Sequence, residues 1–328
     1  MVLWSRIPLS RWGPLAYDLG PKTPDWSGAA TLTCSMSSSA LPEIVVGVDG
    51  SPAAKVAADW AARDAARRGA TLTLVHVVSS VLGSLSLTPL PTGIGKWQKE
   101  KAHEAIDEAR SVVAAVQKDT GPLHVDTEIY YSSAVPTLVD MSKGADMIVV
   151  GSRRHGAVGS LLGSVSAGVV AHAHCPVAVI HDEDPLMPHP AQAPVLVGID
   201  GSPASELATA IAFDEASRRG VDLIALHAWT EFGVGDFLGM NWLEMKSSED
   251  AALAERLAGW QESYPDVTVR RVVVCDHPAR TLVEHSEQAQ LVVVGSHGRG
   301  GFAGMLLGSV SAAVVQSARM PVIVARQP

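Results

Sequence analysis

Short apolar runs alternate along this chain with longer stretches in which apolar residues recur every three or four positions. This alternation is typical of strands joined by crossover helices in a parallel sheet. Ten strands are predicted, at 44–49, 71–77, 124–130, 147–151, 177–181, 195–200, 222–228, 268–274, 291–295 and 322–325. We therefore expect an α/β fold made of two sets of five β/α steps.

The two sets are copies of one another. Residues 44–76 and 195–227 are identical at nearly half of their positions, which indicates a duplicated domain. We expect a first domain at 41–181, a second at 194–328, and between them a linker at 182–193, which is rich in proline and acid. Residues 1–40 are expected to be a disordered leader. Alternatively, translation begins at Met36, just before the first strand.

The helix that follows the first strand has the same boundary signals in both copies. Ser51 and Ser202 each precede a proline, so a capping hydroxyl stands before a residue suited to the first helical position. Gly69 and Gly220 follow a pair of arginines, which favours a helix end with a left-handed glycine.

Composition and charge exclude several classes of protein. The net charge of -9 and pI of about 5.7 argue against general nucleic-acid binding, which needs clustered Lys and Arg. No apolar run approaches the ~18 residues that span a bilayer, so we expect no membrane segment. The three scattered cysteines favour a reducing compartment, the cytoplasm.

Candidate chemistry lies after the first and fourth strands, because ligands of open parallel sheets bind at the carboxyl ends of strands. Asp49-Gly50-Ser51 and Asp200-Gly201-Ser202 follow the first strands, and a glycine-rich loop at 295–311 follows the fourth strand of the second copy. We expect its glycines to adopt positive φ and let the backbone approach an anion, at the start of the next helix. Arg299 and His297 would add charge.

Two clusters elsewhere have plainer explanations than chemistry. His172-Ala173-His174-Cys175 falls at the predicted end of a helix, where histidines complement the helix dipole better than they form a metal site. Cys275-Asp276-His277 is expected to be a turn, since adjacent side chains rarely face each other as a nucleophile and base must. We predict no catalytic residue and no protein-bound metal.

The glycine-rich loop also carries a resemblance to a known family. Gly295-x-x-Gly298, nine residues and Gly308-Ser309 resemble the signature of ATP-binding universal stress proteins, and 46–51 and 197–202 resemble their first-strand motif. The chain is similar to tandem-domain members from mycobacteria. The resemblance implies two Rossmann-like domains with parallel sheets of order 3-2-1-4-5, ATP with Mg²⁺ on its phosphates, packing of the domains as an internal pseudo-dimer, and dimerisation of whole chains.

Carried over by position, the resemblance implies two sets of nucleotide-binding residues. The second copy supplies Asp200, Gly201, Ala228, Gly295, Gly298, Arg299, Gly308, Ser309, Val310 and Ser311. The first copy supplies Asp49, Gly50, Val77, Gly151, Gly163, Ser164, Val165 and Ser166.

The first copy departs from the motif. Its loop is one residue shorter, and Arg153 or Arg154 stands in place of the middle glycine. This arginine either prevents the required backbone or meets a phosphate itself. The function expected is a nucleotide-dependent regulator of stress response or growth. The alternatives are a weak ATPase or phosphotransferase and a dimerisation scaffold with a degenerate first site.

Overall fold

A computed structural model describes residues 41–79, 94–152, 162–182, 190–229, 242–300 and 306–326. The predicted leader, the alternative start at Met36, most of the linker and the two arginines of the first loop, Arg153 and Arg154, lie outside the described residues. Among the described residues no helix is long and apolar enough to cross a membrane.

The elements follow the predicted alternation in both copies. The first copy contains β1 (Glu43–Gly47), α1 (Pro52–Arg68), β2 (Thr71–Val78), α2 (Ile94–Thr120), β3 (Val125–Tyr131), α3 (Ala134–Met141), β4 (Met147–Ser152), α4 (Ser164–His172) and β5 (Val177–His181). After η3 (Pro190–Gln192), the second contains β6 (Val195–Gly198), α5 (Pro203–Arg219), β7 (Leu223–Trp229), α7 (Trp242–Ser263), β8 (Val269–Cys275), α8 (Pro278–Ser286), β9 (Leu291–Gly295), α9 (Ser309–Ser317) and β10 (Val322–Ala325).

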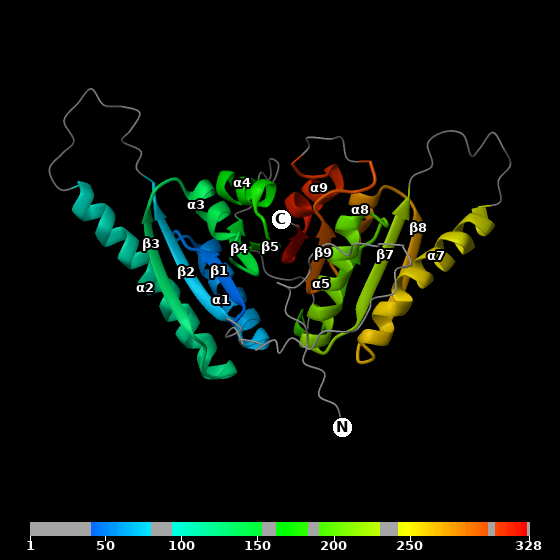
Figure 1. The fold of residues 1–328 in the computed structure, drawn as a ribbon, viewed down its shortest axis with the longest axis horizontal. Helices are drawn as coiled ribbons and strands as arrows, with labels where there is room; N and C mark the ends of the chain where they lie inside the picture. Colours follow the sequence, from blue (N-terminus) through cyan, green and yellow to red (C-terminus); the bar gives the residue numbers. More distant parts are fainter. Residues whose placement is uncertain are drawn as a thin grey trace, which may run out of the picture.

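All ten strands form one sheet, in the order β3-β2-β1-β4-β5-β10-β9-β6-β7-β8. Each half is parallel with the predicted order 3-2-1-4-5, which confirms the fold class. The halves join where β5 and β10 pair antiparallel, with Val177 opposite Val324 (Figure 1). Both strands are fully buried, and their pairing removes two apolar edges that would otherwise face solvent.

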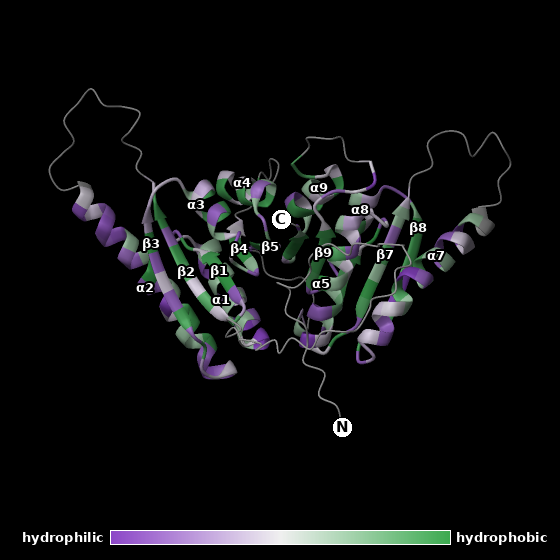
Figure 2. Ribbon diagram, viewed as in Figure 1, coloured by the Kyte–Doolittle hydropathy of each residue, from purple (hydrophilic) through white to green (hydrophobic). Residues whose placement is uncertain are grey.

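Helices cover both faces of this sheet. One buried apolar cluster includes residues of α1, α2, α5 and α7, and a second includes residues of α3, α4, α8 and α9. Neighbouring strand residues divide between them, since Ile44 and Val46 pack in the first cluster and Val45 in the second. Figure 2 shows mostly hydrophobic central strands and hydrophilic turns on α2 and α7. The apolar runs of the sequence therefore correspond to strands of a sheet that is buried on both faces.

The helix boundaries after the first strands are confirmed. Ser51 Oγ accepts from Ala54 N and Ser202 Oγ from Ser205 N, each at 3.2 Å. Gly69 and Gly220 end the helices with φ of 62° and 65°. The same capping residues thus begin and end the helix that follows the first strand in both copies.

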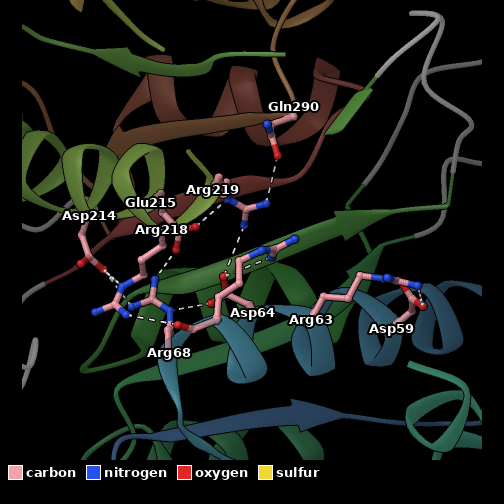
Figure 3. Close-up of polar contacts among 10 residues, drawn as sticks. Asp59, Arg63, Asp64, Arg68, Asp214, Glu215, Arg218, Arg219 and Gln290 are labelled. Carbon is pink, nitrogen blue, oxygen red and sulfur yellow. Dashed lines mark hydrogen bonds and ion pairs between the residues drawn. The ribbon is translucent and has the colours of Figure 1, made fainter. Parts of the chain in front are cut away.

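Charged residues bind α1 to α5 where the copies meet (Figure 3). Arg68 donates through Nε to Asp64 of its own helix at 2.6 Å and also bonds Glu215 of the other copy. Arg219 repeats the pattern, donating to Glu215 at 2.8 Å and to Asp64 at 3.3 Å. Both carboxylates are fully buried. We call these four residues the interdomain ion cluster, and its reciprocal contacts agree with the expected internal pseudo-dimer.

Candidate functional site

A tight turn follows the first strand of each copy and leads into the next helix. Gly50 and Gly201 have φ of 78° and 76°, a conformation that favours glycine. Asp49 Oδ1 accepts from Ser51 N, and Asp200 Oδ1 from Ser202 N, each at 2.9 Å. The acid of the motif therefore closes the turn and places a carboxylate beside a helix N-terminus.

In the second copy the glycine-rich loop is bonded to this turn. Arg299 N donates to Asp200 Oδ2 at 3.0 Å, and Ser202 Oγ donates to the carbonyl of His297 at 3.2 Å. A Cβ atom added to Gly298 would lie 2.6 Å from Asp200 Oδ2, closer than real Cβ contacts. The fold thus joins the two motifs that the sequence placed almost 100 residues apart, and the absence of a side chain at 298 permits it.

Asp200 is held as a carboxylate by these contacts. Burial by itself would raise its pKa, but hydrogen bonds from Ser202, the Arg299 amide and Ser205 outweigh burial and lower the pKa below the usual value of 3.8. An ionised carboxylate is the type of ligand that Mg²⁺ prefers.

The glycines of the strand-four loops differ from expectation in one respect. We expected positive φ, but Gly295, Gly298, Gly300 and Gly308 do not have it. They instead allow close approach, since a Cβ on Gly295 would lie 2.8 Å from the carbonyl carbon of Ala204. Gly151 is equivalent, because its Cβ would lie 2.5 Å from Ala53 O. Among the described residues of the two candidate sites, the glycines with positive φ are Gly50 and Gly201 of the first turns.

The helices α4 and α9 begin at the same edge. Gly163 and Gly308 are their N-caps, and neither N-cap residue makes a side-chain capping hydrogen bond. The first-turn residues Ser164, Val165, Ser309 and Val310 thus present backbone N–H groups that lack helical partners. Ser166 Oγ and Ser311 Oγ donate to the carbonyls of Gly151 and Gly295, at 2.8 and 2.5 Å. These two hydroxyls therefore link α4 to the end of β4 and α9 to the end of β9.

The second strand of each copy ends beside the turn. His76 Nδ1 lies 2.7 Å from Val48 O, and His227 Nδ1 lies 2.6 Å from Ile199 O. The following residues, Val77 and Ala228, pack partly buried against the apolar cluster on the α3 and α8 side. Both predicted second-strand positions, Val77 and Ala228, therefore lie at the carboxyl ends of their strands, as expected.

A cavity of about 390 Å³ occupies the predicted site of the first copy. Asp49, Val77, Gly151 and residues 163–166 line it, so the structure brings together seven of the eight predicted first-copy residues, and the eighth, Gly50, lies in the same turn. Ala134 and Leu138 of α3 also line it. Sequence reasoning missed them, although α3 follows β3 at the same edge and its position was a usable signal.

Sequence reasoning also missed Arg256 of α7. A Cβ on Gly201 would lie 2.6 Å from Arg256 Cζ and 2.6 Å from Arg299 Nη2, so two guanidinium groups lie over one glycine turn. Arg256 also pairs with Glu206 at 3.2 Å. Nothing in the periodicity of α7 marks this residue, because its importance comes from the turn that it covers.

The cluster at 172–175, to which no chemistry was assigned, lies at the end of a helix. His172 is the last residue of α4, as expected. Cys175 is buried, and burial raises the pKa of its thiol to about 12. Within the part of the chain that the structure describes, no group of three or more His, Cys, Asp or Glu residues is arranged to hold a metal ion.

Comparison with known proteins agrees with the duplicated architecture. The model of the universal stress protein family matches residues 42–181 and again 193–326. A universal stress protein of Mycobacterium tuberculosis is 60% identical over 285 residues, covering 87% of this chain and 96% of that protein. One of Mycolicibacterium smegmatis is 52% identical over 284 residues, covering 86% and 96%. A universal stress protein structure from Archaeoglobus fulgidus shares the fold, with a TM-score of 0.66 at 21% identity over 87% of this chain and 98% of that one.

Proposed function

Because the chain belongs to the universal stress protein family, we propose that it binds ATP at the carboxyl edge of its sheet. The bound nucleotide would act as a regulatory ligand in the response to stress or in growth control. The observation that carries the proposal is the second-copy arrangement in which Asp200, the Gly201 turn and Gly298 meet beside the N-terminus of α9. Backbone N–H groups at a helix start favour phosphate oxygens.

The residues at the carboxyl ends of the second-copy strands have different roles in this proposal. The adenine would lie near Ala228 at the end of β7, and the phosphates near residues 308–310 and Arg299. Asp200 fits a Mg²⁺ ion carried on the phosphates, because its low pKa keeps it ionised at neutral pH. The ion would supply charge neutralisation of the triphosphate. The equivalent first-copy residues line a cavity, which supports a second nucleotide site in the first copy.

Two further parts of the proposal rest on the sequence. The three scattered cysteines support a cytoplasmic location. The family resemblance supports a dimer of whole chains. Since β5 and β10 pair within the chain, such a dimer would use another surface than these two strands.

The test is a comparison of two glycine substitutions in one loop. Gly298→Val should abolish ATP binding by the second copy, because the new side chain collides with Asp200 and separates the loop from the turn. Gly300→Val is the matched control, since a Cβ there meets no atom of the described residues within 4 Å. Isothermal titration of nucleotide-free protein would count ATP per chain, and the protein as purified would be extracted to identify its nucleotide.

We expect Gly298→Val to bind one ATP fewer than the Gly300→Val control. Unchanged binding by Gly298→Val would contradict the site assignment. A wild-type protein that carries no nucleotide and takes up none in titration would contradict the proposed function altogether and favour the scaffold.

A further inference from the structure

The two copies place opposite charges over the same turn. Lys55 and Glu206 lie at the same point of equivalent helices, three residues after the proline of α1 or α5. Each pairs with the helix that follows the second strand: Lys55 with Glu108 at 3.1 Å, and Glu206 with Arg256 at 3.2 Å. The ion pair is therefore present in both copies with its charges exchanged.

The exchange determines which charge faces the glycine turn. In the first copy a Cβ on Gly50 would lie 3.8 Å from Glu108 Oε2, so a carboxylate stands over the turn. In the second copy the same place over Gly201 holds Arg256, with Nη2 at 2.7 Å from the added Cβ. Arg299 brings a second guanidinium to this point. Neighbouring guanidinium groups repel each other, and an anion between them would relieve the repulsion.

We propose that Arg256 is a phosphate-contacting residue and that the charge exchange gives the two copies different ligand preferences. The second copy selects adenine nucleotides with a highly charged phosphate chain. The first copy, where Glu108 replaces the guanidinium, prefers adenine ligands of low charge such as adenosine. This inference rests on the proposed function, because it assumes that both copies accept adenine.

The geometry around Gly201 supports direct contact with a ligand. The turn immediately precedes Ser202, the N-cap of α5, so the guanidinium groups lie where helix N–H groups already favour an anion. Arg256 keeps about 39% of its side-chain surface exposed, and it can therefore reach a bound molecule. Its partner Glu206 is similarly exposed, at 43%, and such surface pairs bind weakly. Releasing the guanidinium to a phosphate would cost little.

The experiment measures ATP and adenosine binding separately, by titration calorimetry of nucleotide-free full-length protein. Arg256→Ala should weaken ATP binding by about tenfold to a hundredfold, the usual effect of losing one charge-assisted hydrogen bond. Adenosine affinity should change by less than about twofold, because adenosine carries no phosphate. Arg256→Lys should restore part of the ATP affinity, since it restores the charge without the guanidinium fork.

Two control variants separate ligand contact from a structural role. Arg271→Ala removes a guanidinium of similar exposure, 37%, that pairs with Asp250 on α7, and it should leave ATP binding unchanged. Glu206→Gln breaks the same ion pair from the other side but leaves Arg256 in place. Direct contact predicts that Glu206→Gln binds ATP at least as tightly as wild type. A structural ion pair predicts that it behaves like Arg256→Ala.

The first copy is tested in the Gly298→Val background, where the second site is inactivated. There Glu108→Gln should strengthen ATP binding and leave adenosine binding unchanged. Equal losses of ATP and adenosine in Arg256→Ala, or no loss of ATP, would overturn the inference while wild-type ATP binding stands. If wild type binds neither ligand, this inference and the proposed function both fail.

Discussion

Equivalent residues of the two copies keep the same charge where α1 contacts α5 but not at the turns after β1 and β6. At the contact, Asp64 and Arg68 have Glu215 and Arg219 as equivalents, so charge signs are kept and the bonds are reciprocal. At the turns, the pairs Lys55–Glu108 and Glu206–Arg256 exchange signs. Helices that pack against one another must keep complementary charges, whereas the two turns do not meet and can differ in charge.

The largest effect is expected where the interdomain ion cluster is cut. Arg68→Ala leaves Asp64 and Glu215 buried without one of their cations, and removing one partner of a buried pair costs about 3–5 kcal/mol. Arg63→Ala is the control, because Arg63 pairs with Asp59 on the same helix with both side chains about 40% exposed. It should cost less than about 1 kcal/mol. Urea unfolding would measure both, and similar small losses would mean that the cluster does not hold the copies together.

A smaller effect separates the two glycine turns. Gly50→Ala and Gly201→Ala both impose a left-handed conformation on alanine, which costs roughly 1–2 kcal/mol. The added methyl meets Ala105 at an ordinary 3.6 Å in the first copy but displaces two guanidinium groups in the second. We therefore expect only Gly201→Ala to weaken ATP binding as well. Thermal unfolding and titration with ATP would check this, and equal effects on binding would remove the difference between the turns.

The smallest effect concerns pH at the second turn. The folded-state pKa of Asp200 lies below 3.8, so its stabilisation is present above that value and is lost as pH falls through the lowered pKa. Asp200→Asn should therefore be destabilised by roughly 1 kcal/mol at neutral pH, and the difference from wild type should shrink below about pH 4. Urea unfolding at several pH values measures it. A difference that grows in acid would contradict the hydrogen-bonded carboxylate.

Much of the fold could be predicted from the chain because its signals are local. Ser51 and Pro52 are neighbours, as are Arg68 and Gly69, so each helix boundary can be predicted from adjacent residues. The apolar runs marked every strand to within a few residues, and the duplication gave two equal sets. The location of the candidate site could also be predicted, since strand ends of a parallel sheet share one edge.

Other features depend on residues that meet only after folding. The sequence placed Asp200 and Gly298 in separate motifs, but their contact and the reason for the glycine appear only in the folded loop. The antiparallel pairing of β5 with β10 depends on two edge strands whose apolar sequence does not specify a partner. No sequence motif marks Arg256. Its role follows from its contact with the turn at Gly201, 55 residues earlier. The sequence alone thus determined the repeated β/α order and its turns, because these follow from neighbours along the chain. Tertiary structure decided which charges face each turn, because side chains distant in sequence meet only when the helices pack.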